Sequence, residues 1–520
     1  MRVEKISLGE TGQFSPIFLE YLAKNESLKD FYQYYPSVEN AEKQIALKKA
    51  FPKRNRLRLE AVLNEQYGAL DMSPRLRENI HALSEENTFT VTTGHQLNIF
   101  TGPLYFIYKI VTVIDACKQL KAKYPNYHFV PVYWAASEDH DFEEISYCYL
   151  YGKKYTWETD QKGAVGRFMP QSLSKVLDEM PDKAPVFEKA YLDHSNLADA
   201  VRYYVNELFG HEGLVMVDGD HPDLKRIFAP IIKQDIEEHV SGKLVDETTK
   251  KLDDAGFKTQ VHAREINFFY LNSIHRDRII EEDGIYKVNN TDLSFTREEL
   301  WQLLEKSPEK FSPNVIMRPV YQEAILPNLA YIGGPAEVAY WLQFKAVFDH
   351  YQLPFPMLMP RNFGLVVQKS QASKIEKLGL KLADLFMEGH EIRKKYVREN
   401  SENDLLLGEE KAAFAKLMEQ VKAKAVAIDK TLDGYMGKQE TRLLQEFEGM
   451  EKKLQKAEEN NQAVAINQIE SIKEKLFPGG SLQERHDNFL NFYLTNPAIL
   501  DEFLKGFDAF DFSFHIFMEE

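Results

Sequence analysis

The stretch Phe89-Thr-Val-Thr-Thr-Gly-His-Gln-Leu-Asn-Ile-Phe-Thr-Gly-Pro103 decides the fold expected for this chain. Its first five residues are β-branched or aromatic, which is typical of a buried strand. The apolar segment that follows, Leu104–Leu120, is long enough for a helix. A strand that passes through Gly94-His95 into a helix places backbone N–H groups and an imidazole at the carboxyl edge of a sheet, where open α/β sheets bind anions and nucleotides. An ordinary strand–loop–helix corner is the alternative, because so short a motif also occurs without function.

A second apolar run, Tyr127–Ala136, is predicted to be a strand covered on both faces. It ends in an acidic stretch, Ser137-Glu-Asp-His-Asp-Phe-Glu-Glu144. Buried carboxylates are costly unless they are paired, so this stretch is expected to face water, a cation or a polar substrate. In one right-handed βαβ unit both strand ends lie at the same sheet edge. The sequence therefore predicts one pocket that contains Gly94, His95, Glu138, Asp139, His140 and Asp141.

The charges of this pocket are expected to serve activity and not folding. Charged side chains at a strand end add little to the core, and their mutual repulsion costs stability unless a ligand or cation relieves it. Replacing His95, Asp139 or Asp141 should then leave stability unchanged or slightly higher. It should slow the reaction by about a hundredfold or more, the scale of deleting a general base or an oxyanion donor.

Two later segments are predicted to extend the pocket. Gly213–Pro222 is predicted to begin as a strand and closes in acid, glycine and histidine, so Asp218 and Asp220 are expected over the same site. Leu353–Val367 is predicted to be one further strand, with Arg361 and Asn362 near its end.

The Gly333-Gly334-Pro335 junction precedes a predicted helix whose first turn carries Glu337, a favourable position for a carboxylate. Proline at that position is typical of the start of a helix, so a tight turn explains the junction. Glycines also let a ligand approach the backbone closely. Both interpretations stay open at this point.

Bulk composition excludes several classes of protein. A net charge of −16 argues against a nucleic-acid-binding surface. The two cysteines, Cys117 and Cys148, lack CxxC spacing and support neither a zinc ribbon nor a disulfide scaffold. The first residues lack the apolar segment of a signal peptide, and no apolar run approaches the roughly 18 residues that span a bilayer. We therefore expect a reduced, cytoplasmic protein without membrane or nucleic-acid partners.

The 520 residues are expected to form about two to four domains. The predicted fold class is α/β, with a nucleotide-binding core over residues 1–372 that carries insertions near 145–210 and 255–330. An α-helical coiled-coil domain is expected over 373–478. A C-terminal helical segment, 479–520, is expected to dock on the core.

Within the expected helical domain, apolar residues recur every seven positions, as at Phe414, Val421 and Ile428. Heptads flanked by Glu and Lys indicate a coiled coil. Read as one nearly continuous helix from Glu409 to Leu476, the arm would reach about 100 Å at about 1.5 Å per residue. Such a helix must pack on the preceding helix, expected near 373–398, or on another subunit, and we expect a homodimer.

Several of these segments together carry a resemblance. Thr92-Thr-Gly-His-Gln96, Trp134-Ala-Ala-Ser-Glu-Asp-His-Asp141, Gly333-Gly-Pro-Ala-Glu337 and the C-terminal coiled coil resemble the bacillithiol biosynthesis cysteine-adding enzyme family. The resemblance implies a ligase that joins cysteine to glucosaminyl-malate through an amide bond. It also implies a Rossmann-like core with connecting-peptide insertions, related to class I aminoacyl-tRNA synthetases, with dimerisation through the coiled coil and use of ATP or another adenine nucleotide.

The chain departs from the synthetase pattern at three points. Only Gly94-His95 remains of the His-x-Gly-His signature, with Thr92 in place of the first histidine. The Lys-Met-Ser-Lys-Ser loop has a weak counterpart in Lys369-Ser-Gln-Ala-Ser-Lys374. Two scattered cysteines cannot form a thiolate-rich zinc site. We assign no metal, although His95, His140 and Asp141 leave a histidine–carboxylate site open.

The expected roles follow from amide formation. His95, Asp139, His140 and Asp141 are the catalytic candidates, for proton transfer or for stabilising developing charge. Nucleotide phosphates are expected against glycine-bearing loops and a lysine, namely Gly94, Gly333, Gly334 and Lys369. The residues expected to bind substrate are Glu138, Asp218, Asp220, Arg361 and Asn362. A metal-dependent hydrolase and a non-catalytic coiled-coil scaffold are the two alternatives.

Overall fold

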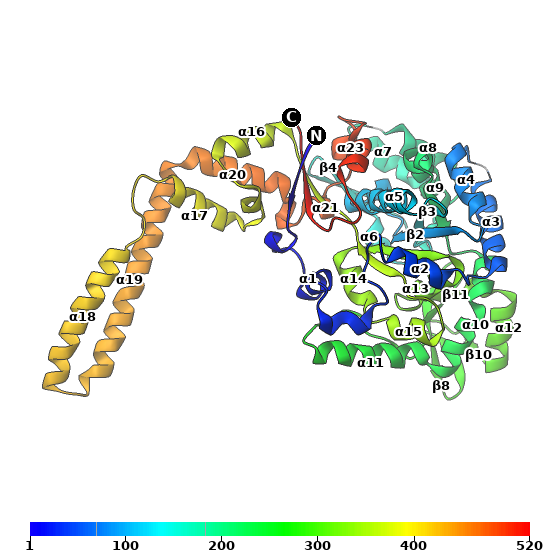
Figure 1. The fold of residues 1–520 in the computed structure, drawn as a ribbon, viewed down its shortest axis with the longest axis horizontal. Coiled ribbons are helices and arrows are strands. Elements are labelled where there is room, and N and C mark those ends of the chain that lie inside the picture. The colour runs from blue at the N-terminus through cyan, green and yellow to red at the C-terminus, as the bar shows by residue number, and fades with distance from the viewer. Residues whose placement is uncertain (69, 183) are drawn as a thin grey trace.

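Strand β2 (Thr88–His95) lies at the centre of a five-stranded parallel sheet. The computed structural model describes residues 1–68, 70–182 and 184–520 (Figure 1). The other strands of this sheet follow the order β13-β12-β2-β3-β6, with bounds β3 (His128–Ala135), β6 (Val215–Asp218), β12 (Asn328–Gly333) and β13 (Met357–Pro360). Strands β3 and β6 come next in the chain and lie on one side of β2, and the later strands β12 and β13 lie on the other side. Strand order therefore reverses between β2 and β12, as in a Rossmann-like sheet, and ligands bind at such a crevice.

The predicted βαβ unit is confirmed. Helix α5 (Tyr105–Lys123) follows β2 and packs on β2 and β3, which pair in parallel with Gly94 opposite Trp134. Both strands are buried along nearly their whole length, which explains their continuous apolar sequence. The expected α/β core is thus present.

The remaining helices of the core surround this sheet (Figure 1). They are α1 (Pro16–Leu22), α2 (Ala41–Lys48), α3 (Lys53–Tyr67), α4 (Pro74–Ala82), α6 (Phe142–Ile145), α7 (Ser174–Glu179), α8 (Pro185–Asp193), α9 (Leu197–Phe209), α10 (Pro222–Glu238), α11 (Val240–Asp254), α12 (Arg297–Lys306), α13 (Met317–Ile325), α14 (Pro335–Trp341) and α15 (Lys345–His350). A short hairpin, β4 (Tyr147–Leu150) and β5 (Lys153–Thr156), follows β3.

A separate antiparallel sheet lies between α11 and β12 in the sequence. Its order is β10-β9-β8-β7-β11, with bounds β7 (Phe268–Leu271), β8 (Arg276–Glu282), β9 (Ile285–Val288), β10 (Ser294–Phe295) and β11 (Phe311–Pro313). Strand β7 lies in the insertion expected near residues 255–330. The segment 259–265 before it pairs with no strand among the described residues.

The single strand expected over Leu353–Val367 is in fact two strands in two sheets. Strand β13 ends at Pro360, and β14 (Phe363–Val367) pairs instead with β15 (Phe514–Met518). Strand β1 (Arg2–Ile6) completes this three-stranded sheet on the other side of β15. The C-terminal region also contains α21 (Gln483–His486), α22 (Leu490–Tyr493) and α23 (Ile499–Gly506), so the purely helical expectation for 479–520 omitted β15.

The helical arm projects from the core as an antiparallel hairpin (Figure 1). Helices α18 (Gly408–Ile428) and α19 (Leu432–Asn461) lie side by side, with a Phe414–Phe447 ring contact at 5.4 Å and a Lys411–Glu451 ion pair at 2.7 Å. The expected continuous helix is therefore wrong, since the chain reverses between the two helices. Helices α16 (Lys369–Leu378), α17 (Gly389–Asn400) and α20 (Ala463–Leu476) connect the hairpin to the core.

Among the described residues, no helix is both long and apolar enough to cross a membrane.

Candidate functional site

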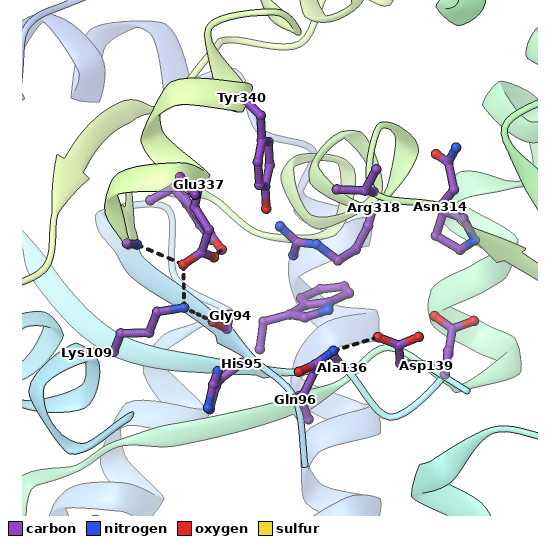
Figure 2. Close-up of a pocket in the computed structure, with 18 of the residues that line it drawn as sticks. Gly94, His95, Gln96, Lys109, Ala136, Asp139, Asn314, Arg318, Glu337 and Tyr340 are labelled. Atoms are coloured by element: carbon purple, nitrogen blue, oxygen red, sulfur yellow. Dashed lines mark hydrogen bonds and ion pairs between the residues drawn. The ribbon is translucent and has the colours of Figure 1, made fainter. Parts of the chain in front are cut away.

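A cavity of about 850 Å³ opens at the carboxyl ends of β2 and β12, where the strand order reverses. Gly94 and His95 at the end of β2 line it, as do Glu138 and Asp139 after β3 and Gly334 after β12. The sequence prediction of one pocket shared by the β2 and β3 strand ends is therefore confirmed for these residues. Figure 2 shows the side chains that face this space.

A buried ion pair joins the two strand ends at the floor of the cavity. Lys109 Nζ lies 2.6 Å from Glu337 Oε2 and donates to the Gly94 carbonyl at 2.7 Å (Figure 2). Glu337 also accepts from Tyr331 Oη at 2.6 Å and from Gly334 N at 2.8 Å. Burial alone would raise the pKa of Glu337, but Lys109 and these hydrogen bonds lower it, so the carboxylate stays charged.

The Glu337 carboxylate occupies the helix N-terminus that was expected to receive phosphates. Gly334 N already donates to Glu337, and α14 is a short helix. Gly333 does not line the cavity. The structure therefore supports the first interpretation of Gly333-Gly334, a tight turn at the start of a helix. The Glu337 carboxylate of that helix accepts the backbone N–H of Gly334.

A side chain at Gly94 would crowd the neighbouring Tyr331. A Cβ placed there would lie 3.1 Å from Tyr331 Oη, which is tighter than ordinary van der Waals contact. Thr92, where the synthetase signature has its first histidine, is fully buried and donates to Asn328 Oδ1 at 2.8 Å. That position therefore sends no side chain into the cavity.

His95 lines the cavity as a neutral imidazole. Burial lowers its pKa well below the ordinary value, and the charges of Lys109 and Arg361 lower it further. Its ring packs beside Tyr105 and Phe106, and Nε2 is buried without a hydrogen-bond partner. His95 can therefore offer a neutral donor or acceptor, and it does not hold a positive charge for phosphates.

Glu138 is a structural residue as well as a lining residue. Its carboxylate forms an ion pair with Lys225 of α10, whose side chain is fully buried and also donates to the Phe311 carbonyl at 2.7 Å. Burial raises the pKa of Glu138, and Lys225 opposes that rise. The pair ties the β3 loop to α10 and β11.

Asp139 is held by Arg276 and Gln96. Arg276 Nη1 lies 3.3 Å from Asp139 Oδ1, and Gln96 Nε2 donates to Oδ2 at 3.1 Å. Burial alone would raise the pKa of Asp139, but hydrogen bonds from His140 and Gln96 and the charge of Arg276 hold it well below its usual range. Asp139 is thus a permanent anion, suited to binding an ammonium group and weak as a base at neutral pH.

The other two residues predicted for the pocket, His140 and Asp141, lie outside the cavity lining. His140 Nδ1 accepts from Arg276 Nη1 at 2.8 Å, and the imidazole is about half exposed. Asp141 precedes α6 and accepts from Glu144 N at 3.4 Å, as a helix cap does. The expectation of a mutually repelling cluster is wrong, because Glu138 and Asp139 each have a cationic partner.

Arg361 and Asn362 support the site from behind. Arg361 lines the cavity, but its Nη2 forms a 2.6 Å ion pair with the fully buried Glu484. Asn362 bonds to Thr112 and to the Asp508 carbonyl at 2.7 Å and does not line the cavity. The two residues join β13, α5 and the C-terminal region.

Three further candidates lie in other cavities. Asp218 and Asp220 line a separate cavity of about 880 Å³ beyond β6, where Ser137 Oγ donates to Asp218 and Arg167 forms a two-point ion pair with Asp220. Lys369 lies in a groove beside Arg2 and Glu519. The expectation that these residues join the β2 pocket is wrong.

The sequence prediction missed the residues that dominate the cavity chemically. Lys109 and Arg276 hold the carboxylates described above, and Arg318 of α13 lines the wall. The sequence does mark Lys109, because it is the only charged residue in the apolar first half of α5. Arg276 and Arg318 come from the insertion, and nothing in the local sequence marks them.

The cavity is strongly cationic within an acidic chain. Its three carboxylates, Glu138, Asp139 and Glu337, are all paired. Among the described residues, four lining arginines have no carboxylate partner: Arg264, Arg278, Arg318 and Arg485. A cleft lined by one sign of charge concentrates ligands of the opposite sign. The unpaired arginines therefore favour a ligand with carboxylate or phosphate groups.

In the part of the chain that the structure describes, no three histidine, cysteine or acidic side chains are placed to hold a metal ion. Cys117 and Cys148 are buried free thiols, and burial raises the pKa of both.

Replacing Glu138 should destabilise the protein. Glu138→Gln leaves Lys225 charged and unpaired in the interior, so the free energy of unfolding should fall by about 3–5 kcal/mol. Urea denaturation measures this. Asp141→Asn is the matched control from the same loop, because asparagine caps a helix as well as aspartate, and its effect should stay within about 0.5 kcal/mol. Equal stability of Glu138→Gln and its parent would contradict the structural role.

His95 should make the protein sensitive to acid. Its pKa is lowered on folding, so the unfolded chain takes up the proton first, and stability present above about pH 6.5 is lost as the pH falls. His95→Gln should remove up to about 1.4 kcal/mol of this loss per pH unit below that value. Denaturation at several pH values compares variant and parent. His515, whose pKa burial lowers to about 4, contributes to both proteins alike and cancels. Parallel pH curves would show that His95 titrates normally.

Comparison with known proteins agrees with this architecture. The family described as "Bacillithiol biosynthesis BshC, N-terminal Rossmann-like domain" matches residues 1–362, and its C-terminal coiled-coil domain matches residues 364–519. Similar proteins named "Putative cysteine ligase BshC" occur in Flavobacterium johnsoniae (43% identity) and Flavobacterium psychrophilum (44%), each with 95% of both chains covered. One in Christiangramia forsetii is 41% identical over 98% of both chains. The chain belongs to the bacillithiol biosynthesis BshC family.

Proposed function

We propose that this protein is a ligase that joins the carboxyl group of cysteine to the amine of glucosaminyl-malate. Family membership supports a cysteine ligase, and one observation supports the second substrate. Among the residues that the structure describes, four arginines of the cavity at the β2–β12 crevice have no carboxylate partner, and malate brings two carboxylates. A neutral or cationic substrate would leave these guanidinium groups uncompensated.

The paired groups of the cavity suit the other half of the reaction. Asp139 stays ionised and can hold the ammonium group of an incoming amine or amino acid. His95 stays neutral beside Gly94 and can accept or donate one hydrogen bond near the reacting carboxyl. Amide formation also requires an activated carboxyl, and ATP would supply that activation in the manner of class I synthetases. Lys369, which was expected at its phosphates, lies in another groove.

The experiment combines purified protein with cysteine, glucosaminyl-malate and ATP and follows products by mass spectrometry. We expect the amide-linked thiol, and ATP-dependent formation accompanied by AMP if the carboxyl is activated as proposed. Asp139→Asn should lower product formation by about a hundredfold, the scale of losing a placed charge. Product from glucosaminyl-malate but none from a glucosaminide with an uncharged aglycone would support anion recognition. Absence of any cysteine-containing product from the parent would contradict the proposed function.

We also propose that the arm joins two copies of the chain. The α18–α19 hairpin leaves large apolar side chains in solvent, namely Leu417 (55% exposed), Val421 (40%), Met450 (50%) and Leu454 (40%). These side chains lie on the same heptad stripes as Phe414 and Phe447, which contact each other inside the hairpin, so the hairpin covers these stripes only in part. Apolar stripes that remain partly exposed on a helical hairpin favour association with another helix pair.

Positive charge on these partly exposed apolar stripes should give a monomer. The double variant Val421→Lys, Leu454→Lys places two cations on the proposed contact, and light scattering should report half the parent mass. Leu443 is left intact, because it is half-buried within the arm. Glu446→Lys, on an exposed polar position of α19, is the matched control and should keep the parent's mass. An unchanged dimer in the double variant would place the contact elsewhere, and a monomeric parent would contradict the proposal.

A further inference from the structure

Arg318 differs from the paired cations of the cavity. Lys109, Arg276 and Arg361 each face a carboxylate within 3.3 Å. Arg318 makes one side-chain hydrogen bond, from Nη1 to Gln322 Oε1 at 3.1 Å, and has no ion pair among the described residues. Its full positive charge is therefore left for something that enters the cavity.

The orientation of Arg318 is fixed by a chain of buried groups. Gln322 is fully buried, and its Nε2 donates to Glu323 Oε1 at 3.1 Å, so its oxygen must face Arg318. Glu323 in turn accepts from Asn328 Nδ2 and forms a 2.6 Å ion pair with the buried Lys48. The negative charge of Glu323 is thus already balanced by Lys48. Arg318 receives only the neutral amide dipole, which holds one edge of the guanidinium in place without neutralising it.

Aromatic rings leave the other edge of the guanidinium free. Arg318 Cζ lies 5.5 Å from the Tyr331 ring centre and 6.0 Å from that of Trp341. Figure 2 shows the guanidinium pointing into the cavity, with the Tyr340 side chain directed toward the same space across from Gly94. A planar guanidinium held beside these two stacked rings presents two parallel N–H groups, which match the two oxygens of a carboxylate. Low polarity around it strengthens that interaction.

We propose that Arg318 is the specificity-determining receptor for a carboxylate of the acceptor substrate, bound through a two-point guanidinium–carboxylate contact. The inference rests on the proposed function, since it assigns that carboxylate to the malyl group of glucosaminyl-malate. The other unpaired arginines are less suited to this role. Arg264 and Arg485 are exposed, where water and salt screen a charge, so they attract the ligand without fixing its position. Arg278 is half-buried, but no side-chain hydrogen bond or ring contact among the described residues fixes its guanidinium.

The test measures binding by calorimetry with glucosaminyl-malate, its dimethyl ester, L-malate and ADP as probes. Arg318→Lys keeps the charge and loses the planar fork, and Arg318→Gln removes both. We expect Kd for glucosaminyl-malate to rise about tenfold or more in Arg318→Lys and further in Arg318→Gln, the scale of a lost charge-assisted contact. The dimethyl ester should bind parent and variants alike. Arg54→Lys, the matched control at an exposed arginine of α3 outside the cavity, should leave Kd unchanged.

Melting temperatures equal to the parent's establish that the Arg318 variants fold, and the ester provides an internal check in the same samples. Unchanged affinity for glucosaminyl-malate in both variants would overturn the inference. Loss of ADP affinity with glucosaminyl-malate affinity retained would also overturn it and would make Arg318 a phosphate receptor.

The outcome for the proposed function is separable. Arg318-dependent binding of L-malate by a parent that forms no thiol product would contradict the ligase and keep the receptor. Product formation with the same KM for glucosaminyl-malate in parent and Arg318→Lys would contradict the receptor and keep the ligase.

Discussion

The ion pair between Lys109 and Glu337 is the constraint on which the site depends. It connects the first half of α5 to the start of α14, and through Gly94 O and Gly334 N it holds the ends of the two strands between which the order reverses. A buried pair of this kind persists only when its hydrogen bonds are satisfied, and here both partners have additional ones. The same carboxylate orients Tyr331, whose ring forms one wall of the Arg318 position. Geometry at the crevice thus follows from a single charge contact.

Charges in this core divide into two groups with different consequences. Those that are paired join segments far apart in sequence, as Glu138 joins α10 and Arg361 joins α21. They give the cavity rigid walls, and Asp139 among them stays ionised beside its cationic partner. The unpaired arginines give the cavity its field. An acidic chain can therefore present a cationic site, because local pairing and not net charge decides the potential in a cleft.

The sequence predicted the strand–helix–strand unit well because its signals are local. Apolar runs mark β2, α5 and β3, and parallel pairing then brings Gly94, His95, Glu138 and Asp139 to one edge. Partners of these residues could not be read in the same way. Lys225 lies 87 residues from Glu138, and Arg276 lies 137 residues from Asp139, so their pairing depends on how whole layers pack.

Other errors also have physical causes. A heptad pattern has the same spacing in a continuous helix and in a hairpin, so the reversal between α18 and α19 was invisible to periodicity. The break at Arg361-Asn362 lies inside an apolar run that continues directly into a different sheet. Asp218 ends β6 in the same sheet and Asp220 follows it, yet both line a cavity different from the one beside β2. Residues at the same edge of a sheet therefore need not line the same cavity.

The three-stranded sheet β1-β15-β14 has a consequence for biosynthesis. Among the described residues, strand β1 pairs with β15 alone, which lies about 500 residues later in the chain, so the ribosome releases β1 long before its partner exists. At about 5–20 residues per second this interval is roughly 25 to 100 s. An unpaired strand edge invites pairing with other chains, and charged side chains discourage it. Three of the five residues of β1, Arg2, Glu4 and Lys5, are charged. Strand β1 pairs late in synthesis, and its charged residues thus discourage association between nascent chains.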